Sequence, residues 1–263
     1  MATRARTSST CRSSSAELVG VIDRSIPTRS GGSARVVFTD RHGGVSRAPY
    51  ESANLAQHVG DDAATVTENR RLVAERLALV PPTRWVEVNQ VHGREVVTLD
   101  DPETRVDADA DAIVTACRDR PLVIFTADCA PIALVADGAV GAVHAGWGGL
   151  HAGVVERAVD ALRRLTPGPI TAVLGPCIHP ERYEFGADLL DRMVAHFGPV
   201  VAGRTSDGTP AFDIPAAVRI ALARAGVDEV DDVGVCTAAS NDYFSYRRDG
   251  VTGRQAMFVV CET

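Results

Sequence analysis

One apolar stretch constrains the fold of this chain more than any other, because it joins two long apolar runs through a strong turn signal. It spans residues 126–150 and reads TADCAPIALVADGAVGAVHAGWGGL. The Asp-Gly dipeptide at 137–138 is favoured in two-residue turns, so the stretch predicts a buried β-hairpin. Asp128 and Cys129 stand near its start and His144 near its end. Strand ends carry side chains out of the core, so the hairpin predicts a functional site at the rim of a sheet.

Hydrophobic periodicity elsewhere predicts a chain in which strands outnumber helices. We expect strands at residues 34–41, 84–93, 94–99, 110–115, 121–127, 131–136, 139–145, 170–175, 232–236 and 254–261. We expect helices at residues 61–79, 149–165, 186–197 and 214–225. Because hairpins mix with crossover connections in this order, the sequence predicts a mixed α and β (α+β) fold with helices covering mixed β-sheets.

The first 32 residues differ in composition from the rest of the chain. They are rich in Arg and Ser and lack the continuous apolar segment of a secretory signal. Their apolar content is too low to offset the entropy lost on ordering, so residues 1–32 are predicted to be a disordered tail. Residues 33–263 read as one catalytic domain, without an internal repeat or an interdomain linker.

Charge and cysteine content narrow the class of protein. The formal net charge is −7, which disfavours a nucleic-acid binder, since such proteins present a basic face. No apolar run approaches the roughly 18 residues that span a membrane, so no membrane partner is expected. The six cysteines lie far apart without the spacing of a disulfide framework, which favours a reduced cytoplasmic protein. The oligomeric state is left open.

Three side chains at the ends of predicted strands have the chemistry of metal ligands. They are His92, Cys129 and His144. Two imidazoles and one thiolate suit zinc, and three protein ligands leave a fourth position open for substrate, as in catalytic sites. Structural histidines and a buried apolar thiol are the alternatives. Gln90 shares a predicted strand face with His92, so it is expected to contact substrate.

Several motifs then occur in a recognisable order. They are RHGGVS (41–46), NLAQHVGDD (54–62), NQVHG (89–93), DADAIVT (109–115), TADCAPI (126–132), VHAGW (143–147), LGPCI (174–178) and FSYRRDG (244–250). Together they resemble the YfiH/PgeF laccase-domain family, and the resemblance covers about residues 33–263. It implies a single-domain αββα sandwich with mixed β-sheets, and it implies zinc ligands at His92, Cys129 and His144.

The resemblance also implies an activity. Members have been described as purine nucleoside phosphorylases that also deaminate adenosine, so inosine, adenosine, methylthioadenosine and phosphate are the expected substrates. Cys129, His92, His144 and Gln90 are then the expected catalytic residues. The matching motifs place substrate-binding residues at Arg41, Asn54 and Arg247.

Three other functions remain open from the sequence. One is a hydrolase that edits peptidoglycan precursors, with Cys129 as nucleophile and a histidine as base. Another is a copper polyphenol oxidase, which is disfavoured because the chain has only seven histidines and its three methionines lie in no obvious motif. The last is a non-catalytic binding protein.

One position departs from the family pattern. The family commonly reads HAGWRG, whereas this chain reads HAGWGG, with Gly148 where an arginine is usual. A guanidinium binds anions well, so its absence questions a phosphate contact from this position and leaves Arg41 and Arg247 as candidates. A positive φ at Gly148 or Gly149 is a further expectation, because the motif is rich in glycine.

Overall fold

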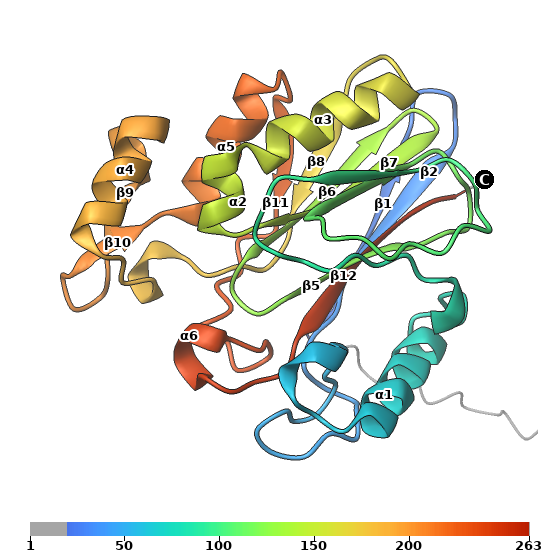
Figure 1. The fold of residues 1–263 in the computed structure, drawn as a ribbon, viewed down its shortest axis with the longest axis horizontal. Helices are drawn as coiled ribbons and strands as arrows, with labels where there is room; N and C mark the ends of the chain where they lie inside the picture. The colour runs from blue at the N-terminus through green and yellow to red at the C-terminus, as the bar shows by residue number, and fades with distance from the viewer. Residues whose placement is uncertain (1–19, 263) are drawn as a thin grey trace, which may run out of the picture.

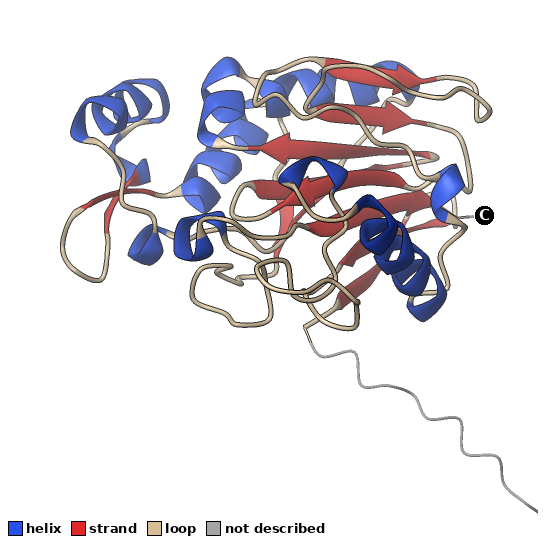
Figure 2. Cartoon of the chain, turned by 60° about the horizontal axis from the view of Figure 1, so that its bottom comes forward, coloured by secondary structure: helices blue, strands red, loops and turns tan. Residues whose placement is uncertain are grey.

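The computed structural model describes residues 20–262, so the disorder predicted for residues 1–19 lies outside the described residues. Two large β-sheets face each other, and helices cover the outer face of each (Figure 1; Figure 2). This arrangement confirms the predicted αββα sandwich with mixed sheets. Within the described range, no helix is long and apolar enough to cross a membrane.

The elements follow one another along the whole described range. The strands are β1 Ile22–Pro27, β2 Ser33–Phe38, β3 Val96–Leu99, β4 Ala112–Thr115, β5 Leu122–Thr126, β6 Ala130–Ala136, β7 Ala139–Ala145, β8 Thr171–Leu174, β9 Ala202–Arg204, β10 Pro210–Phe212, β11 Glu229–Asp232 and β12 Gln255–Cys261. The α-helices are α1 Ala63–Arg76, α2 Trp147–Ala152, α3 Val154–Leu165, α4 Ala187–Phe197, α5 Ile214–Arg224 and α6 Tyr246–Asp249.

The predicted hairpin lies at the centre of the larger sheet, whose strand order is β11-β8-β6-β7-β4-β3. β6 and β7 pair antiparallel with Ala136 opposite Ala139, and Gly138 makes the turn with a φ of 74°. Every residue of both strands is buried. Successive side chains point to opposite faces, so Ile132 packs towards the helices and Ala133 towards the second sheet. Burial on both faces explains why the stretch is apolar almost throughout.

Helices α2, α3 and α5 cover the larger sheet, with α3 lying along it (Figure 1). The single helix predicted over 149–165 is wrong, because Gly153 interrupts it with a φ of 86°. The Gly153 N–H closes α2 on the carbonyl of Leu150, and the same residue precedes α3. Left-handed glycine is a common helix end, so the break follows from local chemistry. The predicted helix α4 lies at one end of the molecule, beside the β9–β10 pair, which was not predicted (Figure 1).

The smaller sheet has strand order β1-β2-β12-β5 and packs against helix α1. Val73 and Leu77 of the α1 region are buried with Phe258 of β12. Trp85 meets Phe258 edge-on, with ring centroids 4.7 Å apart. Between the two sheets, a third apolar cluster closes the sandwich and includes Phe38.

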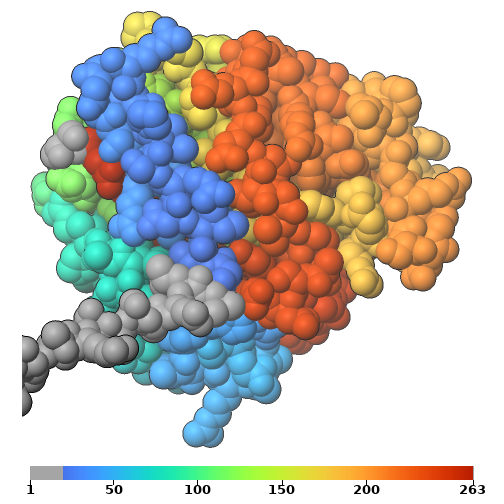
Figure 3. All heavy atoms as spheres, turned by 180° about the vertical axis from the view of Figure 1, so that it is seen from behind, coloured from blue at the N-terminus to red at the C-terminus, as the bar shows by residue number. Residues whose placement is uncertain are grey.

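The predicted tail reaches too far along the chain. Residues 22–27 form β1, which pairs antiparallel with β2 and places Ile26 opposite Ala34. Ile22 and Ile26 pack against the core between the sheets. Prediction of disorder is wrong here because β2 supplies a ready edge, which two apolar side chains suffice to hold. From behind, this blue segment runs beside orange C-terminal segments (Figure 3), where Arg24 lies 3.5 Å from Asp231.

Residues 84–93 do not form the regular strand that their alternation predicts. Only isolated bridges occur, from Val86 to Leu122 and from Asn89 to Asp109. The backbone N–H groups of Val86 and Asn89 still bond to backbone carbonyls. Those of residues 91–93 bond instead to the Asp111 side chain. The predicted strand at 232–236 is also shifted, since β11 ends at 232.

Candidate metal centre

His92, Cys129 and His144 meet at one end of the larger sheet. They offer one ligand-type atom each, and these atoms all lie within 4.8 Å of one another. His92 Nε2 is 3.8 Å from Cys129 Sγ, and the centroids of the two imidazole rings are 4.9 Å apart. No other His, Cys, Asp or Glu cluster within residues 20–262 meets this condition. Three residues separated by up to 52 positions are therefore brought together as predicted.

The central hairpin supplies two of the three side chains. His144 is the penultimate residue of β7, and Cys129 immediately precedes β6. Asp128 has a φ of 102° in the short turn that leads to β6. His92 lies in a loop with a φ of 59°, and not at the end of a strand as predicted. The cluster thus joins two rigid strand ends to one loop residue.

Asp111 holds both the loop and the buried histidine in place. Its carboxylate is buried and lies 2.7 Å from His144 Nδ1. It also accepts hydrogen bonds from the backbone N–H groups of His92, at 3.0 Å, and Gly93, at 2.6 Å. An ionised carboxylate only accepts, so Nδ1 of His144 carries a proton, and Nε2 is the ring nitrogen left to bind a metal once it is deprotonated. Asp111 therefore orients two of the three candidate ligands.

The charges of the cluster support one another. Burial opposes ionisation of Cys129, but His144 and His92 outweigh burial and lower the pKa of the thiol to about 6. Burial likewise opposes protonation of His144, but Cys129 and Asp111 raise the pKa of the imidazole to about 9. Burial also acts to raise the pKa of Asp111, yet His144 and the loop N–H groups hold it below its usual range. Without metal, the cluster is a thiolate–imidazolium pair braced by a carboxylate.

The donor set fits a transition metal. Zinc takes thiolate sulfur at about 2.3 Å and imidazole nitrogen at about 2.0–2.1 Å, so tetrahedral ligand atoms lie roughly 3.3–3.6 Å apart. The observed separation of 3.8 Å between Cys129 Sγ and His92 Nε2 needs only a small contraction. The carboxylate on His144 is the partner that metal-binding histidines usually have. A His/Cys/His cluster able to hold a metal is therefore present.

Glycines beside the cluster let the backbone approach it closely. A Cβ atom at Gly146 would lie 3.0 Å from Cys129 Sγ and 3.0 Å from His92 Cδ2. A Cβ atom at Gly148 would lie 3.2 Å from the carbonyl oxygen of His92. Neither Gly148 nor Gly149 has the positive φ that the motif suggested, because both belong to helix α2. The expectation of a strained backbone there is wrong.

Asp128 points away from Cys129 and ties two distant loops together. Its carboxylate accepts hydrogen bonds from Thr237 Oγ1, at 2.6 Å, and from the backbone N–H of Arg247, at 2.7 Å. Its own carbonyl accepts the N–H of Ile178 at 2.8 Å. Asp128 therefore orients the loops around the site.

Two predicted site residues have structural contacts instead. The Gln90 amide exchanges two hydrogen bonds of 2.9 Å with the backbone of Phe125, which explains why no strand ladder is needed there. Asn54 is fully buried and bonds to Ala56, to Asp61 and to the backbone N–H of Arg254. These contacts contradict the substrate contact expected of Asn54 and disfavour the catalytic role expected of Gln90.

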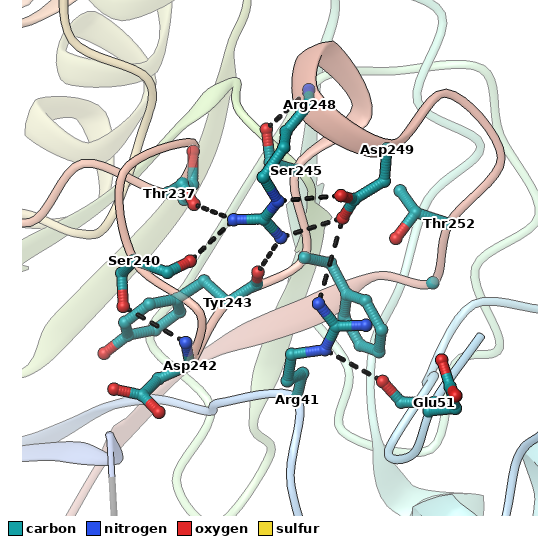
Figure 4. Close-up of polar contacts among 12 residues, drawn as sticks. Arg41, Glu51, Thr237, Ser240, Asp242, Tyr243, Ser245, Arg248, Asp249 and Thr252 are labelled. Atoms are coloured by element: carbon teal, nitrogen blue, oxygen red, sulfur yellow. Dashed lines mark hydrogen bonds and ion pairs between the residues drawn. The ribbon is translucent and has the colours of Figure 1, made fainter. Parts of the chain in front are cut away.

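Arg41 is held in a polar network of its own (Figure 4). Its guanidinium lies over the Phe244 ring, 4.8 Å from the centroid, and Nε donates to the carbonyl of Glu51 at 2.9 Å. Asp249 lies 3.8 Å from Arg41 and is also bonded by Arg248. Nε of Arg41 is therefore engaged by the backbone, and a nearby carboxylate offsets part of its positive charge.

Arg247 lies on the other side of the Asp128 loop. Its guanidinium stacks over Tyr183, 4.6 Å from the ring centroid, and Nη1 donates to the carbonyl of Glu184. The side chain is exposed and lines a shallow cavity of about 340 Å³ together with Arg248. The structure leaves it available for a ligand, and its predicted role stays a prediction.

Two residues beside the cluster were missed from the sequence. Asp111 stands directly before the fully buried strand β4 and ends a run of three alternating aspartates, and an acid so close to an apolar strand is the signal that could have found it. Arg254 directly precedes β12, with Cys129 among the charges that act on it. An arginine at the start of an apolar closing strand was the corresponding signal.

Comparisons with known proteins agree with this geometry. A family model described as multi-copper polyphenol oxidoreductase laccase matches residues 35–262. "Purine nucleoside phosphorylase ORF3" of Streptomyces griseus is 46% identical over 236 residues, which cover 87% of this chain and 94% of that protein. "Purine nucleoside phosphorylase YfiH" of Shigella flexneri is 38% identical over 223 residues, which cover 83% of this chain and 90% of that protein.

A solved structure shares the fold as well. YlmD from Geobacillus stearothermophilus superposes with a TM-score of 0.81 at 33% sequence identity, covering 88% of this chain and 92% of that chain. Motifs, fold and sequence identity agree over nearly the whole described range. The chain therefore belongs to the YfiH laccase-domain family.

Proposed function

We propose that this protein is a zinc-dependent purine nucleoside phosphorylase that also deaminates adenosine. The observation that carries the proposal is the convergence of His92, Cys129 and His144, with Asp111 holding one imidazole in the tautomer that can bind a metal. Relatives that this chain matches over most of their length are named purine nucleoside phosphorylases. Inosine, adenosine and methylthioadenosine are the proposed nucleosides, and phosphate is the second substrate.

Zinc is the proposed metal, in preference to copper. Two imidazoles and one thiolate would hold zinc, which supplies Lewis-acid chemistry to an oxygen of phosphate or water. A blue-copper site adds a weak axial ligand, often a methionine sulfur. Met193 and Met257 are instead buried in apolar clusters.

Phosphorolysis sets clear demands on the residues of the site. A phosphate oxygen bonds to C1′ of the ribose while the C1′–N9 bond breaks and leaves its electron pair on the purine, which takes up a proton. Positive charge must therefore lie beside the phosphate, on a protein whose net charge is −7. Asp111 would keep the cluster rigid because it holds His144 in place. Gly146 contributes because it has no Cβ atom that would clash with Cys129.

Deamination makes a different demand on the same site. Water adds at C6 of adenine and ammonia leaves, so no anion needs to be held. Gly148 removes the guanidinium that most relatives are expected to carry, and this change penalises phosphorolysis more than deamination. Deamination of adenosine is therefore proposed to be at least as fast as phosphorolysis of inosine in this protein.

A second candidate function rests on one specific observation. Without metal, Asp111, His144 and Cys129 form an acid, a base and a thiol with a lowered pKa, which is the arrangement of a cysteine hydrolase. Peptidoglycan precursors are the substrates proposed for that case. Bound zinc would hold the thiolate as a ligand and exclude this role.

The test is product analysis with the purified protein. Inosine and phosphate are expected to give hypoxanthine and ribose 1-phosphate, and adenosine alone is expected to give inosine and ammonia. Both reactions should stop in Cys129→Ala. If the zinc-loaded protein forms none of these products, the proposed function is wrong.

Five described cysteines are free, which agrees with the proposed cytoplasmic location.

A further inference from the structure

Arg254 is a cation at the rim of the sandwich that carries the candidate metal centre, and the motifs did not bring it forward. It directly precedes Gln255, which pairs with Thr126 at the end of β5. The chain after Thr126 leads within three residues to Cys129. Because β12 begins opposite the end of β5, Arg254 lies at the same rim of the sandwich as the ligand cluster.

The backbone at Arg254 is held by buried groups. Asn54 Oδ1 accepts the Arg254 N–H at 3.0 Å, and the Asn54 amide is itself bonded on the far side. The next residue, Gln255, is buried and exchanges hydrogen bonds with the backbone of Phe244. The Arg254 side chain therefore projects from a fixed backbone. The buried Asn54 holds that backbone in place and does not itself contact substrate.

The guanidinium itself retains free donors. Nη1 donates to the carbonyls of Thr252, at 2.8 Å, and Gly253, at 3.0 Å. Within residues 20–262, Nε and Nη2 have no acceptor, and no carboxylate forms an ion pair with this arginine. Neither nitrogen is a buried orphan, so both remain open to a ligand. Tyr246 lies under the guanidinium, 5.8 Å from ring centroid to Cζ, and limits its movement.

The electrostatic surroundings match an anion site. Burial lowers the pKa of Arg254, while Cys129 and Asp128 act in the opposite direction. The thiolate of Cys129 and the carboxylate of Asp128 thus favour the cationic form of this guanidinium. A metal on the cluster would compensate the thiolate, so that the remaining positive charge of Arg254 faces an incoming anion. Partial burial makes each such contact stronger than it would be in bulk water.

We propose that Arg254 binds the phosphate substrate beside the metal cluster, in the role left open by Gly148. The inference rests on the proposed function for its substrate, and names the group that supplies the missing positive charge. Nε and Nη2 present two parallel N–H donors, which match two oxygens of one phosphate. Arg41 is already bonded to Glu51 and faces Asp249, and Arg247 is exposed, so Arg254 is the better placed of the three cations.

The test compares three variants in the zinc-loaded full chain. Arg254→Gln should raise the KM for phosphate by roughly 10- to 150-fold, the effect of losing one charged hydrogen-bonded contact. Arg254→Lys should restore part of the affinity, since charge remains without the two-pronged geometry. Arg224→Gln is the matched control, because Arg224 also stacks over an aromatic ring, Phe197 at 5.2 Å, and should leave phosphate binding unchanged. Adenosine deamination, which needs no phosphate, should change little in Arg224→Gln, and in the Arg254 variants it should fall less than phosphorolysis does.

Calorimetric titration with inorganic phosphate separates this inference from the proposed function. If wild type binds phosphate and Arg254→Gln does not, while neither cleaves inosine, the anion site stands and the proposed reaction fails. If wild type cleaves inosine and folded Arg254→Gln keeps its KM for phosphate, the inference fails and the reaction stands. Zinc content and melting temperature are measured on every variant. If Arg254→Gln unfolds, Arg254→Lys alone decides, and an unchanged KM for phosphate then overturns the inference.

Discussion

The carboxylate of Asp111 lies 2.7 Å from Nδ1 of His144, and the same carboxylate accepts the backbone N–H of His92. One buried acid therefore sets the orientation of an imidazole on a strand and the path of the loop that carries the other imidazole. The pair links the rigid hairpin to the most exposed of the three candidate ligands.

This relationship predicts the behaviour of Asp111→Asn. The amide keeps the size of the side chain but no longer selects the Nδ1–H tautomer of His144, so zinc affinity should fall by about 10- to 100-fold. Competition with a chelator measures the affinity. Asp107→Asn is the control, because Asp107 is exposed and lies only four residues before Asp111. Equal zinc affinity in Asp111→Asn and wild type would show that the carboxylate does not support the metal.

The close approach at Gly146 predicts a steric effect. In Gly146→Ala, the new methyl group would meet both Cys129 and His92 at 3.0 Å, so zinc binding should weaken and the free energy of unfolding should drop by about 1–3 kcal/mol. Gly186→Ala is a matched control, because Gly186 also precedes a helix and has no heavy atom within 4 Å of the added carbon. Metal analysis and denaturant unfolding report the two effects. A variant that retains full zinc content would show that Cys129 and His92 can move away from the new methyl group and still bind the metal.

The shifted thiol predicts a pH dependence in zinc-stripped protein. Cys129 has a pKa of about 6, below its usual value, so it is deprotonated above that pH and becomes protonated as the pH falls through about 6. Alkylation of Cys129 by iodoacetamide, followed by peptide mass spectrometry, should therefore persist at pH 7 and be lost below about 6. His144→Asn removes the main stabilising charge and should move the midpoint upward. A midpoint near 9 in the stripped wild-type protein would rule out the thiolate–imidazolium pair.

Gly148 predicts a gain of function. Its backbone is helical, so Gly148→Arg avoids strain from φ and needs only a small displacement of the His92 carbonyl, which lies 3.2 Å from the new Cβ. An added guanidinium should lower the KM for phosphate and leave adenosine deamination nearly unchanged. Phosphate saturation curves measure the KM for phosphate, and a melting curve shows whether the variant is stably folded. A stably folded Gly148→Arg variant with the wild-type KM would place the phosphate out of reach of this position.

Much of the fold could be predicted because the hairpin and α3 bury continuous apolar surfaces. The three candidate ligands could be found because they sit in recognisable motifs. Local patterns failed where side chains replace backbone partners, as when the Gln90 amide takes the place of strand pairing. They failed again at β1, where two apolar residues suffice because β2 offers an edge.

The remaining errors have the same origin in tertiary contacts. Asn54 was expected to contact substrate, yet it is buried and bonds to the backbone of Arg254 just before β12. Asp111 and Arg254 stand out by their positions beside apolar strands, but the sequence does not reveal their partners, which lie far away along the chain. Side-chain roles of this kind depend on the folded arrangement, and single-sequence patterns do not contain it.

The central claim is tested most directly by titrating zinc into stripped protein. Inosine and phosphate are supplied as substrates, and the release of hypoxanthine is measured. We expect the rate to rise linearly and to level off at about one zinc per chain, with no response in Cys129→Ala. Phosphorolysis by stripped protein at the rate of the zinc-loaded protein, or a full zinc response in the Cys129→Ala variant, would contradict a catalytic metal at His92, Cys129 and His144.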